Sequence, residues 1–152
     1  MNGLIFIAGI KGLFFNLPFL QRNTNLKLNF MKLRIKGNSI RFRLSKSEVS
    51  KLAVTGYLEE HTSFGDKQFV YALQTAESAI ELSATLDPNK MTMIVPHKLV
   101  KDWPYNNVVG FDVTKLLPGG NGLYLLLEKD FACIDHTTED QSDNYENPNK
   151  IC

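Results

Sequence analysis

The chain has 152 residues, 43% hydrophobic and 22% charged, and this length suffices to bury one core without disulfides or a structural metal. The composition excludes a disordered, collagenous or coiled-coil chain. Two cysteines, Cys133 and Cys152, are too few for a secreted disulfide framework, which favours a reducing, cytoplasmic location.

Charge is divided between the two ends of the chain, although the formal net charge is only +1. The first 47 residues contain nine lysines or arginines and no acid, whereas from Glu128 onward there are seven acids and two lysines. The two ends can therefore attract each other, or each can attract an external partner of opposite charge.

Residues 1–30 form an apolar leader that precedes the regular part of the chain. Eleven Leu, Ile and Phe between Gly3 and Leu20 favour membrane insertion, but Lys11 near the centre opposes it by about 2.5–3.5 kcal/mol. A signal peptide does not fit, because the positive charge lies inside the apolar run. Three interpretations stay open: a start codon assigned before a true start at Met31, a weak membrane anchor, or a segment of the core. A membrane partner is expected only in the second case.

The clearest local pattern is a β-hairpin at the start of the regular part of the chain. Residues 32–36 and 40–44 alternate strictly between apolar and polar side chains, and Gly37-Asn38 between them is a two-residue turn signal. This turn sets Arg34 opposite Arg41. One face of the hairpin is therefore predicted to be apolar and the other entirely positive.

A short helix is predicted directly after the hairpin. Ser45 and Glu48 form a capping-box pattern, in which each side chain hydrogen-bonds to the backbone of the other residue. Gly56 is suited to end the helix, because glycine adopts the left-handed conformation without strain.

The later elements are bounded by turn residues. Turns are predicted at Gly65-Asp66, at 87–89 and at 118–122, and a second short helix is predicted over His97 to Trp103, ended by Pro104. The strands that flank these turns are predicted at 57–63, 68–73, 80–86, 91–95, 108–113 and 123–128. Each connection of this kind is antiparallel.

These elements predict a single α+β domain over residues 31–152. It contains a mostly antiparallel sheet of six to eight strands and two short helices. The segment 135–152 is polar and acidic, and we expect irregular structure there, lying over the sheet or trailing from it.

The positive face of the first hairpin is the main functional feature of the sequence. Like charges opposite one another destabilise a sheet by up to about 1 kcal/mol per pair, so these side chains need a counter-charge. The acidic C-terminal segment, or plain solvation, can meet that need. Alternatively the face binds an anion, either a nucleic-acid backbone or a phosphorylated small molecule. The candidate anion-binding residues are Lys32, Arg34, Lys36, Arg41 and Arg43.

The sequence supports a metal or cofactor site less than it supports anion binding by the hairpin. Zinc-type donors occur near the C-terminus at Cys133, His136 and Cys152. Their spacing lacks the second ligand pair of a zinc finger, so we predict no metal site. The acids Glu139, Asp140 and Asp143 lack the ligand spacing of a calcium loop. No cofactor is predicted.

An enzyme acting on a phosphorylated or other anionic substrate is a third interpretation. Its acid or base would be a carboxylate opposite the basic strands, for which the candidates are Glu128, Glu139 and Asp140. His61 and His97 have no nucleophile partner recognisable in the sequence, and structural roles are expected for both. The absence of a catalytic motif favours a non-enzymatic binding domain.

The first hairpin also carries a local resemblance. The run RIKGNSIRFRLSK, from Arg34 to Lys46, resembles the start of swapped-hairpin DNA-binding domains of the MazE and AbrB type. A basic strand, a G-N-S turn, a second strand and a short helix recur in that type. The likeness covers residues 32–73 and implies an antitoxin-like homodimer with interleaved hairpins, whose basic residues from Gly37 to Arg43 face DNA.

A second resemblance covers the whole domain. Residues 31–152 resemble a small family of uncharacterised bacterial proteins, through the opening basic run and the ending LLEKDFAC followed by TEDQSDNYENP. This resemblance implies no activity. The sequence thus predicts a binding or interaction domain with a basic hairpin face, with DNA binding as the alternative.

Overall fold

A computed structural model describes residues 31–133 and 138–148. These residues form eight strands, two α-helices and one 3-10 helix. The elements are β1 (Lys32–Ile35), β2 (Ser39–Leu44), α1 (Lys46–Thr55), β3 (Tyr57–Phe64), β4 (Lys67–Ala76), β5 (Ser83–Asp87), β6 (Lys90–Pro96), α2 (His97–Val100), η1 (Trp103–Tyr105), β7 (Gly110–Leu116) and β8 (Gly122–Lys129). The leader 1–30 lies outside the described residues.

The strands form two four-stranded sheets of the same plan. Sheet A has the order β1-β2-β8-β7, and sheet B has the order β3-β4-β6-β5. Each sheet consists of two antiparallel hairpins whose second strands pair in parallel at the centre, β2 with β8 and β4 with β6. The fold is therefore α+β and most pairings are antiparallel, as predicted. The prediction of one sheet is wrong, because the strands divide into two mixed sheets.

The opening hairpin and the first helix form as predicted. β1 and β2 pair in the register expected from a turn at Gly37 and Asn38. In the capping box of α1, the Ser45 hydroxyl accepts a hydrogen bond from the Glu48 N–H, and the Glu48 carboxylate accepts one from the Ser45 N–H. The helix ends at Gly56, whose φ of 71° lies in the left-handed region.

Later elements match the predictions in type but not always in their bounds. Residues 80–82, predicted to begin a strand, precede β5, which begins at Ser83. α2 ends at Val100 instead of continuing to Trp103, and Pro104 lies inside η1 instead of ending a helix. Proline fits there because the first turn of a helix does not need the N–H that proline lacks.

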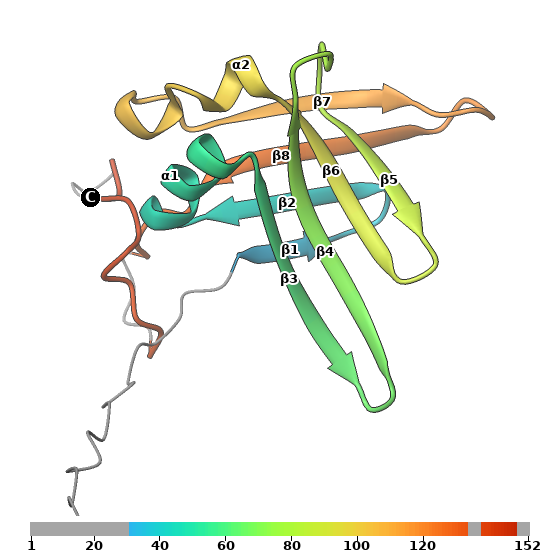
Figure 1. The fold of residues 1–152 in the computed structure, drawn as a ribbon, viewed down its shortest axis with the longest axis horizontal. Coiled ribbons are helices and arrows are strands. Elements are labelled where there is room, and N and C mark those ends of the chain that lie inside the picture. The colour runs from blue at the N-terminus through green and yellow to red at the C-terminus, as the bar shows by residue number, and fades with distance from the viewer. Residues whose placement is uncertain (1–30, 134–137, 149–152) are drawn as a thin grey trace, which may run out of the picture.

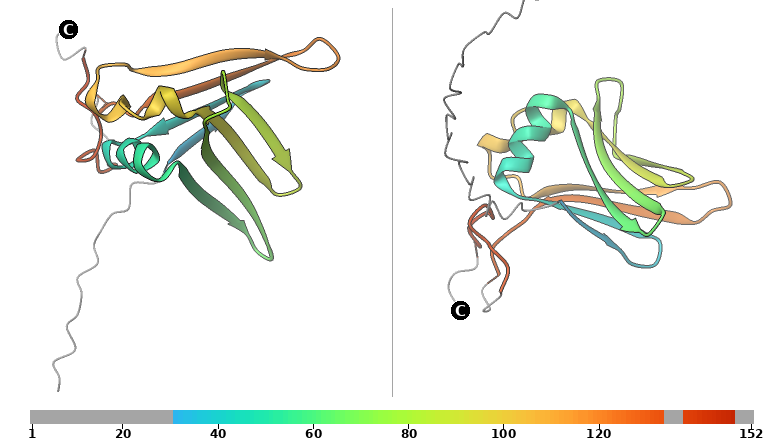
Figure 2. Two further views of the ribbon diagram at one scale, coloured as in Figure 1. Left: turned by 45° about the horizontal axis from the view of Figure 1, so that its top comes forward. Right: turned by 60° about the horizontal axis from the view of Figure 1, so that its bottom comes forward.

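One core joins the two sheets and the helices. The sheets lie face to face with the helices gathered at one end (Figures 1 and 2). Alternation along β2 and β8 buries Phe42 and Leu127, and the Phe42 ring lies 6.3 Å from that of Tyr71 in sheet B. Trp103 of η1 is fully buried in the same cluster. The inner face of sheet A is therefore mainly apolar, and its outer face carries the charged side chains of β1 and β2.

The C-terminal segment lies against the end of sheet A. Its described residues, 138–148, form turns and bends. An isolated parallel bridge joins Phe131 to Tyr145, and the Tyr145 N–H donates a hydrogen bond to the Asp130 carbonyl. None of the helices in the described part of the chain has the length and apolar character needed to cross a membrane.

Candidate functional site

The predicted cationic residues lie together on the outer side of sheet A. Arg34 pairs with Arg41, and Lys32 pairs with Arg43, so each pair shares a face of the sheet. The alternate residue Phe42 is fully buried, which places the cations on the opposite, outer face. We call this set the basic face; it consists of Lys32, Arg34, Lys36, Arg41 and Arg43.

Glu128 of β8 lies beside the two arginines of β2. The parallel pairing of the strands sets Arg43 opposite Glu128. The Oε1 atom of Glu128 accepts hydrogen bonds from Nε of Arg41 and Nε of Arg43, each at 2.6 Å. The Glu128 side chain is 14% exposed, against 28% for Arg41 and 41% for Arg43. One half-buried carboxylate thus neutralises and orients two guanidinium groups.

Lys32 is matched by two acids from the C-terminal part of the chain. Its Nζ lies 2.9 Å from Oδ2 of Asp130 and 3.1 Å from Oε2 of Glu139. Partial burial opposes the charged ammonium, but the hydrogen bonds to Asp130 and Glu139 hold the pKa of Lys32 above its ordinary value. The acidic end of the chain therefore neutralises part of the basic face. This is the alternative to anion binding that the charge pattern of the sequence allowed.

Arg34 and Lys36 carry the remaining charge of the basic face. Both side chains are exposed, at the turn end of the first hairpin. Neither forms an ion pair with any residue of 31–133 or 138–148. The positive surplus is therefore concentrated near this turn, and anion binding by the face stays a prediction.

A pocket of about 280 Å3 adjoins the arginine pair. It is lined by Arg41, Arg43, Glu128, the segment 129–133 and Asn147. Arg43 contacts Glu128 through Nε, and its two Nη groups donate no hydrogen bond to a described residue. Unused guanidinium donors beside a pocket of this size are suited to a small anionic group.

The C-terminal segment that walls this pocket is attached to the start of α1. The Asp143 carboxylate accepts hydrogen bonds from the Ser47 hydroxyl at 2.5 Å and from the Ser47 N–H at 3.2 Å. Partial burial opposes ionisation, but hydrogen bonds from Ser47 and Ser45 hold the pKa of Asp143 below its ordinary value of 3.8. An acid at this end of a helix also interacts favourably with the helix dipole.

Asp143→Asn is expected to lower the free energy of unfolding by about 0.5–1 kcal/mol at pH 7. The carboxyl is more acidic in the folded chain than in the unfolded chain, so its stabilisation is present above pH 3.8 and is lost as pH falls through the lower folded pKa. Urea unfolding from pH 7 to pH 2 should show the two proteins converging at low pH. A difference that stays constant with pH would contradict the role given to the carboxylate.

The residues named for metal and acid–base chemistry are only partly brought together. Cys133 is exposed at the rim of the arginine pocket, whereas His136 and Cys152 lie outside the described residues. No group of three potential ligands occurs in 31–133 and 138–148. His97 lies 2.8 Å from Glu77, and His61 is exposed on β3.

The three candidate carboxylates for an enzyme have different surroundings. Glu128 accepts two guanidinium hydrogen bonds beside the pocket, Glu139 pairs with Lys32, and Asp140 accepts a hydrogen bond from the Ser142 N–H. Of these, only Glu128 lines the arginine pocket. An acceptor already engaged by two cations is better suited to orient them than to transfer protons.

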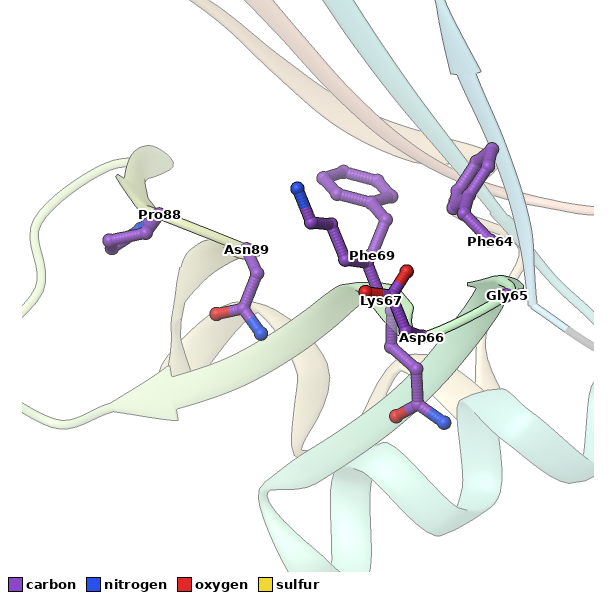
Figure 3. A pocket seen from close by; sticks show the side chains of 8 residues that line it. Phe64, Gly65, Asp66, Lys67, Phe69, Pro88 and Asn89 are labelled. Atoms are coloured by element: carbon purple, nitrogen blue, oxygen red, sulfur yellow. The ribbon is translucent and has the colours of Figure 1, made fainter.

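A second hollow lies between two hairpin turns of sheet B. It has a volume of about 690 Å3. Figure 3 shows Phe64, Asp66, Lys67, Phe69 and Asn89 around it. Its polar lining residues, in the two turns and at the start of β4, are all exposed. It lacks the convergent, partly buried charges that the arginine pocket has.

The sequence did not identify Asp130 as part of the site. Asp130 is buried and pairs with Lys32, and its backbone N–H donates a hydrogen bond to the Leu44 carbonyl. It thus extends the pairing of β8 with β2 by one residue. The sequence did contain a signal for it. Glu128 and Asp130 are two residues apart, so their side chains share a face if the strand continues to Asp130.

Comparison with known proteins gives one match. A family model described as a family of unknown function, DUF7009, matches residues 31–149. No curated protein and no solved structure matches the chain.

Proposed function

We propose that this chain, which belongs to the DUF7009 family of unknown function, is a non-enzymatic binding module for an anionic ligand. The ligand lies against the outer side of sheet A, in the pocket beside Arg41 and Arg43. The observation that carries this proposal is the arrangement of these two guanidinium groups, held by Glu128 with donors of Arg43 left unused.

The arginine pair is organised before any ligand arrives. Ordering a long side chain on binding costs about 0.5–1.5 kcal/mol, and Glu128 has already met part of that cost for Arg41 and Arg43. Guanidinium groups bind carboxylates and phosphates through paired N–H donors, which lysine lacks. A phosphate or carboxylate group is therefore the chemical class that fits best.

The charge of the surrounding face supports the same ligand class. Arg34 and Lys36 have no acidic partner among the described residues, and they extend the positive surface from the pocket toward the turn. Their field would attract an anion and raise its association rate, an effect that salt screens. A polyanion would contact both parts of the face, whereas a small anion needs only the pocket.

DNA binding of the swapped-hairpin kind is the second candidate, favoured by the exposed cations at the turn. In this chain β2 pairs with β8 on the side away from β1, so the hairpin has a sheet partner within its own chain. The hairpin is therefore already paired within a single chain, and DNA binding through it does not require an interleaved dimer.

For the cellular setting, we propose the cytoplasm of a bacterium, because the cysteine content is low and the whole domain resembles a family of bacterial proteins.

Thermal unfolding with rising inorganic phosphate, at constant ionic strength, tests the proposal on the full chain. A ligand at about ten times its Kd stabilises by about 1.4 kcal/mol, and the wild-type Tm should continue to rise with the logarithm of the phosphate concentration above Kd. Arg43→Gln should abolish this rise. Lys98→Gln, which removes an exposed cation of α2 far along the chain from the pocket, is the matched control and should respond like the wild type.

Two outcomes would count against the pocket. A phosphate response that persists in Arg43→Gln, or is lost equally in Lys98→Gln, would contradict it.

A gel shift with duplex DNA at several salt concentrations tests the second candidate, because DNA binding should weaken steeply with salt and depend on Arg34 and Lys36. A DNA complex that is insensitive to Arg34→Gln and Lys36→Gln would contradict that candidate.

A further inference from the structure

Lys129 breaks the apolar pattern of β8. Alternate residues of this strand, Leu125 and Leu127, point into the core and are fully buried. Lys129 is the next residue with the same orientation, lies opposite Leu44 of β2, and is only 4% exposed. A lysine thus occupies a position where the strand period calls for an apolar side chain.

The amine of Lys129 lies among aromatic rings and without an acid. Its Nζ lies 4.8 Å from the centre of the Tyr145 ring and 5.8 Å from that of Trp103. It donates one hydrogen bond, to the backbone carbonyl of Asn106 at 2.5 Å. No carboxylate among residues 31–133 and 138–148 forms an ion pair with it. Burial lowers the pKa of Lys129, because the charged ammonium is poorly solvated there.

A pocket of about 490 Å3 opens onto this lysine. It adjoins the arginine pocket, with which it shares Lys129 and Phe131, and lies between η1, the residues just before β7 and the C-terminal segment. Its lining includes the aromatic side chains of Tyr105, Phe131 and Tyr145, together with Pro104 and Pro148. Such walls suit an apolar or aromatic ligand of small size.

We propose that Lys129 is an amine nucleophile, and that this pocket takes an aldehyde or ketone with an apolar or aromatic body as an imine. The neutral Nζ donates its lone pair to the carbonyl carbon, giving a carbinolamine. The two amine protons leave with the carbonyl oxygen as water, and a C=N bond remains. No oxidant or reductant is consumed. A lysine made less basic by burial in an apolar pocket is activated for this step.

The contacts of Lys129 explain how the amine would be held for this reaction. The Asn106 carbonyl that accepts its hydrogen bond can also accept one from the protonated imine. The rings of Trp103 and Tyr145 stabilise a cation in either state. The imine needs no group from the basic face, although Lys129 and Phe131 line both pockets. Because phosphate tests the arginines and an uncharged aldehyde tests Lys129, the two proposals can fail independently.

Reductive labelling of the full wild-type chain tests the inference. The protein is treated with benzaldehyde and sodium cyanoborohydride near pH 7, and benzylation of each lysine is followed by peptide mass spectrometry. Lys129 should be labelled on the order of tenfold faster than the exposed Lys98 and Lys101, and this preference should disappear in urea. Labelling of Lys129 no faster than of these two lysines would overturn the proposal.

A substituted protein gives the specificity control. Lys129→Arg keeps the positive charge over the rings but removes the nucleophilic amine, so its other lysines should be labelled as in the wild type. Saturable protection of wild-type Lys129 by added benzyl alcohol, which has the aromatic ring of the probe but carries no charge and forms no imine, is expected if the pocket binds the aromatic body. No protection at any benzyl alcohol concentration would contradict a binding pocket. Because the deciding comparison uses the wild-type chain, a folding defect in Lys129→Arg does not affect it.

Discussion

Trp103→Ala is expected to lower the free energy of unfolding by about 3–5 kcal/mol, the largest effect of any single change considered. Trp103 is fully buried in the core, in the 3-10 helix η1 that packs against α1. Its ring lies 5.1 Å from that of Phe111, and its Nε1 donates a hydrogen bond to the Val108 carbonyl at 2.8 Å. The substitution removes this packing together with the hydrogen bond to the Val108 carbonyl.

Urea unfolding followed by circular dichroism is the measurement, because the chain contains no other tryptophan to report by fluorescence. Tyr105→Ala is the control, since Tyr105 belongs to the same 3-10 helix but its side chain is 87% exposed. It should change stability by less than about 0.5 kcal/mol. A loss below about 1 kcal/mol for Trp103→Ala would contradict the position given to this side chain.

Glu128→Gln should have opposite effects on stability and on anion binding. The variant keeps an acceptor oxygen between Arg41 and Arg43 but leaves their charges unneutralised on a face that already holds other cations. Stability in phosphate-free buffer should fall by about 1–2 kcal/mol, less than for a fully buried pair because the arginines are partly exposed. Removing one negative charge beside the pocket should raise phosphate affinity at least about fivefold.

Chemical unfolding with and without phosphate measures both effects of Glu128→Gln. Phosphate should restore much of the lost stability, and more than it adds to the wild type. Glu59→Gln is the matched control, since Glu59 pairs with Lys90 at 2.6 Å on sheet B, away from the basic face. An identical phosphate response in Glu128→Gln and the wild type would show that this carboxylate does not control an anion site.

Local signals were sufficient to predict most of the elements. The turn at Gly37-Asn38 sets the register of the first hairpin, and the Ser45 and Glu48 pattern sets the start of α1. Each of these depends on neighbours along the chain, which the sequence displays directly. The bounds predicted at 80–82 and at Pro104 were wrong, because both segments carry apolar residues next to turn residues.

The division into two sheets was not predictable in the same way. The pairs β2–β8 and β4–β6 join strands that belong to different hairpins, and no turn residue encodes such a contact. The position of Glu128 beside Arg41 and Arg43 depends on the first of these pairings. The sequence therefore identified the cations of the basic face and named Glu128 among three candidate carboxylates, but it did not predict the contact of Glu128 with Arg41 and Arg43.

The most direct test of the anion-binding account is a titration of the full, 15N-labelled chain with inorganic phosphate, monitored by NMR at the arginine Nε–H groups and backbone amides. We expect saturable shifts at Arg41, Arg43 and the amides of 130–133, which line the arginine pocket. Shifts that do not saturate, or that spread evenly over exposed cations such as Lys98 and Lys67, would contradict a built site on sheet A.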